Sequence, residues 1–283
     1  MRKTPLFLVM ILLLAPSVLS WGPNTHLAIL SKAIDDSPPS LIKEIITENL
    51  DGCYPGLVYA DVGIFYYYTN FKLYSGLHNY NVVSEMLRLS KDDRDRAFAY
   101  CYKSHLAADA ISHNFFIPAA IRRTRIPNYI IHPIQELKIE GFYLNPVANK
   151  LMERHKEFDS LVTQASGKDW SVDAARLNTI IGGGEFYSKA YQPDSTTFMG
   201  MFQKWGYTFL AKFVGVEKSV PYFELSIEET KAVLRGETSS LDPSGESALK
   251  KADSDSQLML YIISFLVIIA VFWVSWKFKI IGF

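Results

Sequence analysis

Three residues that can bind metal ions recur at intervals of four in the segment SHLAADAISH: His105, Asp109 and His113. In an α-helix, residues four apart project from the same face, one turn above the other. Imidazole and carboxylate groups on one face are typical ligands of zinc. A solvated polar stripe is the simpler interpretation, but the surrounding residues are largely apolar, and buried ionisable groups are costly unless they are paired or bound to a metal. The spacing therefore predicts a metal site on a buried helix.

Further potential ligands are scattered over the first half of the chain: His26, Asp61, His78, His132 and Glu136. His132 and Glu136 are again four residues apart, in HPIQE, where the proline suits the first turn of a helix. Asp61 and His78 fall near the expected ends of helices. Each of these residues taken alone is more often structural than functional, so only their combination supports a metal site.

The elements that must position these side chains have helical patterns nearly throughout. Two prolines precede SLIKEIITENL, an amphipathic run. Ser90, followed by Asp93, resembles a capping box at the start of a long helix that continues to Phe115. Further helices are expected after Pro146 and over residues 196–215. Because no sustained alternation of polar and apolar residues indicates a sheet, we predict an all-α fold.

Both ends of the chain contain apolar segments. Residues 1–20 have the features of a secretory signal peptide: two basic residues, a short apolar run, and small residues before the expected cleavage point. Residues 258–276 are 19 consecutive residues without a charge, which predicts a single transmembrane helix. Between these segments we expect a helical globular domain at residues 21–235 and a polar, breaker-rich linker at residues 236–257.

The expected signal peptide also sets the orientation of the chain. It places the globular domain on the extracytoplasmic side of the cell membrane and leaves residues 277–283 as a cytoplasmic tail, so we expect a single-pass membrane protein. In an oxidising compartment Cys53 and Cys101 could pair or stay free, and two cysteines alone do not decide between these possibilities.

Composition bears on the class of ligand. The formal net charge is +0 at pH 7, with 29 basic and 29 acidic residues, so no basic surface for a nucleic acid is indicated. Aromatic side chains gather at residues 65–74. They could line a pocket for a lipid or a stacked base, or more simply pack in the core.

The order of the motifs resembles one known family. Trp-x4-His, an Asp, a His, His-x3-Asp-x3-His and His-x3-Glu follow one another over about residues 21–140, as in the zinc-dependent phospholipase C family. This helical superfamily binds three zinc ions and also contains zinc nucleases specific for single strands. SHLAADAISH is most similar to the branch that contains glycosylphosphatidylinositol-specific phospholipase D. The resemblance implies a zinc-dependent hydrolase of phosphoric diesters.

The resemblance also implies which residues hold up to three zinc ions. One ion would be bound by the terminal amine and carbonyl oxygen of Trp21 with His26 and Asp109, a second by Asp61, His78, His105 and Asp109, and a third by His113, His132 and Glu136. Asp61 would serve either as a ligand or as the general base. His113 follows Asp109 more closely than is usual in the bacterial phospholipases and the nucleases, which leaves its metal ion open. His155 is expected at the surface.

We therefore expect an exported, membrane-anchored zinc phosphodiesterase that hydrolyses the head groups of phospholipids or glycolipids through a hydroxide shared by two metal ions. An exported zinc nuclease of the same superfamily and a membrane-tethered zinc-binding domain without catalytic activity are the alternatives. The neutral composition and the expected membrane helix favour a lipid substrate over nucleic acid. Head-group specificity, C-type against D-type cleavage and the oligomeric state are left open.

Overall fold

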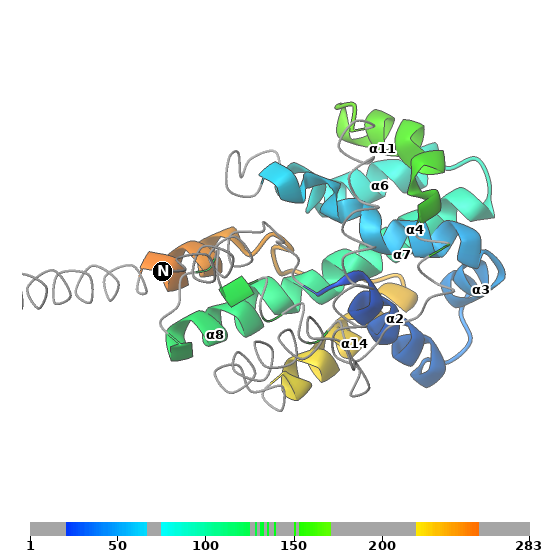
Figure 1. Cartoon of the computed structure of the whole chain (residues 1–283). Coiled ribbons are helices and arrows are strands. Elements are labelled where there is room, and N and C mark those ends of the chain that lie inside the picture. Colours follow the sequence, from blue (N-terminus) through cyan, green and yellow to red (C-terminus); the bar gives the residue numbers. More distant parts are fainter. Residues whose placement is uncertain are drawn as a thin grey trace, which may run out of the picture.

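The computed structural model describes residues 21–66, 75–124, 153–170 and 219–254, together with positions 128, 131, 132, 135, 139 and 150. Within this part the chain is helical and contains no strand, which confirms the predicted all-α architecture there (Figure 1). The helices are α2 (Pro23–Asp36), α3 (Leu41–Glu48), α4 (Leu50–Tyr59), η1 (Ala60–Tyr66), α6 (Tyr80–Leu89), α7 (Asp93–Ile111), η2 (Ser112–Phe116), α8 (Ile117–Thr124), η3 (Glu153–Phe158), α11 (Asp159–Ser166) and α14 (Val220–Leu234).

Helix α7 lies in the middle of the described fold (Figure 1). From Ala97 to Ile111, every residue of α7 except Tyr100 is buried. One side of α7 packs with α2, α3 and α14 in a hydrophobic cluster that includes Trp21, and another side packs with α6 and α11 in a second cluster that includes Tyr102. A helix covered on several sides places its own polar residues in the protein interior.

Helices α4 and α7 run parallel and in close contact. A Cβ atom added to Gly56 would lie 2.2 Å from the carbonyl oxygen of Phe98, and Gly52, one turn earlier, is nearly as close to the backbone of α7. Only glycine allows this approach, because it has no Cβ atom. A disulfide between Cys53 and Cys101 joins the same two helices and decides the question that the sequence left open.

The predicted helix starts are confirmed in one case and corrected in another. Ser40 caps α3 by accepting a hydrogen bond from a backbone N–H of its first turn, where the prediction placed the start of a helix. The long helix α7 is capped by Asp92, whose side chain accepts a hydrogen bond from the N–H of Asp95. Ser90, the predicted cap, instead donates to the carbonyl oxygen of Met86 and so completes the end of α6.

The segment expected as a polar linker, residues 236–257, differs from the prediction over its described part. Residues 243–245 are buried, and the chain is then helical over residues 246–254, with Leu249 and Ala252 in the main hydrophobic cluster. Polar composition misled the prediction because the contacts are made by backbone atoms and only a few apolar side chains. These residues belong to the folded domain.

Several predicted segments lie outside the described residues. They are the signal peptide at 1–20, the helix at 196–215, the transmembrane helix at 258–276 and the tail at 277–283. In the part of the chain that the structure describes, we find no helix with both the length and the apolar character needed to cross a membrane.

Candidate metal centre

Helix α7 provides two of the predicted ligands from adjacent turns. Nε2 of His105 lies 3.0 Å from Oδ2 of Asp109, as their spacing of four predicts. After Ile111 the helix widens into the π-helical turn η2, which contains His113. Such turns within α-helices are frequent at functional sites. The shared stripe is therefore confirmed for His105 and Asp109, whereas His113 lies on a turn of different pitch.

The carboxylate of Asp109 faces three imidazoles. Its Oδ2 lies 3.2 Å from Nε2 of His78 and 3.0 Å from Nε2 of His105. Its Oδ1 lies 3.3 Å from Nε2 of His26. Because the two oxygens face different imidazoles, this one carboxylate has the arrangement needed to contact two neighbouring cations. The resemblance assigns this bridging role to Asp109.

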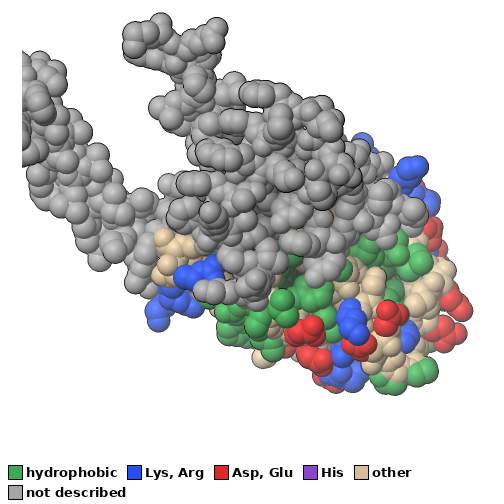
Figure 2. Space-filling model, turned by 60° about the horizontal axis from the view of Figure 1, so that its bottom comes forward, with side chains coloured by type: hydrophobic (Ala, Val, Ile, Leu, Met, Phe, Trp, Pro, Cys, Tyr) green, Lys and Arg blue, Asp and Glu red, His purple; other side chains and the backbone are tan. Residues whose placement is uncertain are grey.

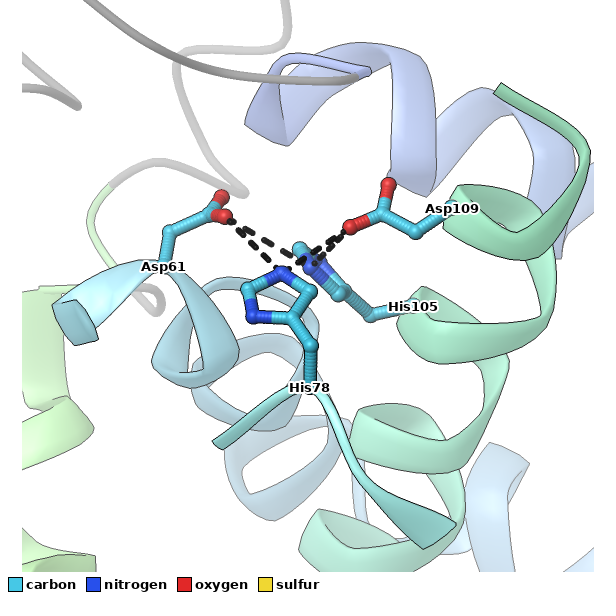
Figure 3. A group of neighbouring side chains, drawn as sticks. All are labelled: Asp61, His78, His105 and Asp109. Carbon is cyan, nitrogen blue, oxygen red and sulfur yellow. Dashed lines mark hydrogen bonds and ion pairs between the residues drawn. The ribbon is translucent and has the colours of Figure 1, made fainter. Parts of the chain in front are cut away.

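Asp61 completes the group from another side (Figure 3). Its Oδ1 lies 3.6 Å from Nε2 of His105 and 3.8 Å from Nε2 of His78. One potential ligand atom from each of Asp61, His78, His105 and Asp109 lies within 4.8 Å of the others, and all four residues are buried. Figure 3 shows the two carboxylates on either side of the two imidazoles. The four residues assigned by resemblance to the second zinc ion are thus gathered in one place.

The fold positions Asp61 and His78 at the ends of helices. Asp61 is in the first turn of η1, directly after α4, and His78 comes two residues before α6. The hydroxyl of Tyr102 on α7 donates to the carbonyl oxygen of Leu77 at 2.9 Å. Helix α7 therefore contributes two candidate ligands and also fixes the backbone beside a third.

A backbone carbonyl orients His105. Its Nδ1 lies 2.7 Å from the carbonyl oxygen of Leu57 on α4. Because a carbonyl oxygen only accepts, Nδ1 is the nitrogen that donates, and Nε2 faces the carboxylates. Leu57 and His105 each lie one turn beyond the cysteines of the disulfide between Cys53 and Cys101. Leu57 could not be predicted from the sequence, since its side-chain type says nothing about its carbonyl group.

Helix α2 brings His26 against His105, and their rings stack with centroids 3.9 Å apart. Trp21, two residues before α2, is fully buried. Its indole N–H donates to the carbonyl oxygen of Ala108 at 3.2 Å and to the hydroxyl of Ser226 at 3.1 Å. The first two residues of the predicted ligand set are therefore anchored to the C-terminal part of α7.

His113 and His132 form another side of the cluster. Their ring centroids are 5.3 Å apart, and the ring of His113 lies 6.0 Å from that of His78. Both residues are fully buried. Glu136, the remaining predicted ligand, lies outside the described residues. All five histidines of the predicted site are therefore near one another.

Burial and the two carboxylates set the protonation of this cluster. Burial lowers the pKa of His26 and of His78 to about 4. Burial also opposes protonation of His105, but the charges of Asp109 and Asp61 outweigh it and raise the pKa of His105 to about 9. Burial disfavours the charged form of Asp109, yet the facing histidines, first His105, hold the pKa of this carboxyl well below its usual range.

The arrangement fits zinc. With its Nδ1–H donated to Leu57, a neutral His105 directs a lone pair from Nε2 at the carboxylate of Asp109, 3.0 Å away. Two facing lone pairs repel, so this contact is favourable only with a proton or a cation between the two atoms. A histidine that donates one ring N–H to a backbone carbonyl and directs the other nitrogen inward is common among metal ligands. Imidazole and carboxylate donors suit zinc.

All six histidines of the chain are buried. Accordingly, no histidine side chain of the described residues is visible on the face drawn in Figure 2. The prediction that His155 lies at the surface is wrong: it is fully buried, and its ring meets that of Tyr59 edge-on, with centroids 6.1 Å apart. His155 and Phe158 lie three apart in the 3₁₀-helix η3, where this spacing places both on one face.

The fold and the cluster together define a helical protein with a buried metal site of the zinc type. Residues 25–176, more than half of the chain, match the family model described as zinc-dependent phospholipase C, and the chain belongs to this family. Membership implies a zinc-dependent hydrolase of phosphoric diesters. Neither a curated protein nor a solved structure matches the chain. Trp21 and α14 lie outside the matched range.

Proposed function

We propose that this protein is an exported phosphodiesterase, anchored to the cell membrane by one helix, that hydrolyses the head groups of phospholipids or glycolipids. Family membership supports zinc-dependent hydrolysis of a phosphoric diester. The central observation is the position of Asp109, whose two oxygens face His26 on one side and His78 and His105 on the other. A carboxylate so placed can hold two cations close together, as hydrolysis of phosphodiesters by paired metal ions requires.

The proposed ligand sets follow the resemblance: Trp21, His26 and Asp109 for one zinc ion, Asp61, His78, His105 and Asp109 for a second, and His113, His132 and Glu136 for a third. When bound, zinc would polarise the phosphodiester and lower the pKa of a coordinated water. The carbonyl group of Leu57 keeps Nε2 of His105 directed at this site. We propose Asp61 as a ligand, because it faces the same two imidazoles as Oδ2 of Asp109.

The proposed location and substrate have independent support. The disulfide between Cys53 and Cys101 favours an oxidising compartment, as export would provide. The apolar segment 258–276 favours attachment to a membrane. A net charge of +0 does not favour a nucleic acid as substrate. The similarity of SHLAADAISH to the phospholipase D branch makes glycosylphosphatidylinositol a substrate worth testing beside ordinary phospholipids.

An assay on a panel of phosphodiesters tests this proposal. The purified protein, supplied with zinc, would be incubated with phosphatidylcholine, phosphatidylinositol, a glycosylphosphatidylinositol and single-stranded DNA, with and without a chelator. We expect chelator-sensitive cleavage of at least one lipid. Release of diacylglycerol would indicate C-type cleavage, and release of phosphatidic acid D-type cleavage. Faster cleavage of the DNA would contradict the lipid assignment and favour the nuclease alternative.

A variant of the bridging carboxylate tests the metal site itself. Asp109→Asn keeps the size of the side chain but removes the charge that faces three imidazoles, so we expect the loss of at least two zinc equivalents and of the lipid cleavage. Asp93→Asn makes the same chemical change at an exposed position of α7 and should retain both. Zinc content would be measured by elemental analysis after dialysis. Loss of one equivalent or none would contradict the bridging role of Asp109.

A further inference from the structure

The segment Asp242–Gly245, which we call the strap, lies directly against the π-helical turn that contains His113. Nδ1 of His113 lies 2.7 Å from the carbonyl oxygen of Pro243. The carbonyl accepts, so Nδ1 donates and Nε2 is the nitrogen left to face the other histidines. The side-chain amide of Asn114 donates to the carbonyl oxygen of Asp242 at 2.7 Å. Two adjacent carbonyl groups of the strap thus receive hydrogen bonds from two adjacent residues of η2.

The strap approaches His113 closely because residue 245 is a glycine. Gly245 has a φ of 58°, in the left-handed region that favours glycine. A Cβ atom added there would lie 2.4 Å from Cβ of His113 and 2.7 Å from its carbonyl oxygen. No side chain fits into this space without moving the strap or the turn, so the carbonyl of Pro243 reaches the imidazole only while this position stays a glycine.

Internal hydrogen bonds give the strap a fixed shape. The carboxylate of Asp242 accepts hydrogen bonds from the backbone N–H and the hydroxyl of Ser244, and from the N–H of Glu246. These bonds close a turn and cap the helical stretch that follows. Further along, the carboxylate of Asp253 accepts a hydrogen bond from the N–H of Asn128, four residues before His132. The strap itself, and the helical stretch that follows it, are therefore both attached to segments close to the site.

The geometry points to the strap as the positioning element of His113: the carbonyl group of Pro243 sets which ring nitrogen of His113 is available to a metal ion, and Gly245 permits this contact. The arrangement parallels the carbonyl group of Leu57 on His105, but it comes from a segment outside the matched range 25–176. The part of the chain that matches the zinc-dependent phospholipase C family is completed here by residues outside the matched range. This inference rests on the proposed zinc site.

Two glycine variants of the full-length protein test the role of the strap. Gly245→Ala places an alanine in the left-handed backbone region and brings its Cβ atom into a steric clash with His113. Gly236→Ala is the matched control, since Gly236 has a φ of 85° but its nearest contact for a Cβ atom is Cδ1 of Ile42 at 3.9 Å. Zinc content would be followed by elemental analysis at buffered free zinc, and the tautomer of His113 by ¹⁵N NMR without zinc. We expect Gly245→Ala to bind one zinc ion about 10- to 100-fold more weakly and to change the tautomer signal.

A second variant covers the case in which Gly245→Ala does not fold. Asp242→Ala removes the exposed carboxylate that shapes the strap and adds no atoms, and we expect a smaller loss of the same zinc equivalent, about several-fold. Each variant that folds would be compared with Gly236→Ala. If its zinc affinity and the tautomer of His113 are unchanged, the role of the strap is overturned, while the proposed zinc site stands. A wild-type protein that binds no zinc would overturn the proposed function and this inference together.

Discussion

Removal of the disulfide between Cys53 and Cys101 should lower the stability of the protein substantially while leaving its zinc site in place. The two cysteines are separated by 48 positions in the sequence. Closing a loop of this size in the unfolded chain stabilises the folded state by about 4 kcal/mol through chain entropy. For a domain of this size that corresponds to a fall in Tm of roughly 8–16 °C.

The zinc site should survive because the disulfide is not the only contact between α4 and α7. Gly52 and Gly56 still allow the two backbones to meet, and the carbonyl group of Leu57 still accepts the Nδ1–H of His105. The entropic effect acts on the unfolded chain and leaves these folded contacts unchanged. We therefore expect the zinc affinity of the folded protein to change by less than about tenfold.

Urea denaturation followed by circular dichroism measures the first effect, and zinc titration at buffered free zinc measures the second. The double variant Cys53→Ala/Cys101→Ala would be compared with oxidised wild type. Reduced wild type is the matched control, because it keeps both buried sulfur atoms and loses only the crosslink. A loss of stability below about 1 kcal/mol would refute the argument from loop closure. A large loss of zinc affinity in a folded variant would refute the independence of the helix contact.

Two further predictions concern the metal-binding residues. At pH 6, zinc should displace about one proton from His26, His78 and His105 together, because His105, with a pKa of about 9, is protonated and the other two, with pKa values of about 4, are already neutral. Calorimetry in buffers of different ionisation enthalpy counts the protons released. The measurement uses protein with one residue added before Trp21, so that the amine of Trp21 contributes no proton. If all three histidines had the ordinary pKa of about 6.5, zinc would displace about two protons at pH 6. The native terminus at Trp21 should bind one more zinc ion than that extended protein, since an amide nitrogen cannot replace the amine. Equal zinc content in the two would contradict this role.

The protonation of His105 also gives a pH dependence of stability. The pKa of His105 in the folded protein, about 9, lies above the ordinary value of 6.5, so protonation of His105 stabilises the folded state of the zinc-free protein. This contribution is complete below pH 6.5 and is lost as the pH rises through 9. His26 and His78 act in the opposite direction, because their lowered pKa values destabilise the fold below their ordinary range, between pH 6.5 and 4. Both effects should disappear when zinc occupies the imidazoles.

Side chains at regular spacing were the predictable part of this site. His105 and Asp109 share a face because the helical repeat brings residues four apart together, whatever the rest of the fold does. Asp61 and His78 were found through the order of the motifs, since neither their spacing nor their neighbours mark them as ligands. Their convergence depends on where η1 and α6 begin, which tertiary packing decides.

Backbone contacts were the part that the sequence could not show. The carbonyl groups of Leu57 and Pro243 orient two candidate ligands, yet any residue has a carbonyl group, so no residue pattern marks this role. The strap was predicted to be part of a linker, because polar and turn-forming residues are typical both of linkers and of ordered turns. The prediction that Ser90 caps α7 was wrong for a related reason. Its hydroxyl donates to a backbone carbonyl at the end of α6, and the residue that caps α7 is Asp92.

The electrostatics of the buried group explain why zinc and substrate binding should be coupled. Without zinc, the carboxylates of Asp61 and Asp109 would face one protonated imidazole, His105, and a neutral one, His78, because their pKa values lie near 9 and 4. A net negative charge at a fully buried position is unfavourable and repels an anionic phosphodiester. A divalent cation that displaces the proton of His105 would bring the net charge of these two carboxylates and two imidazoles to zero. Each further cation, held with the help of His26 or of His113 and His132, would make the whole cluster positive. The charge of the site therefore opposes the substrate until zinc is bound and favours it afterwards.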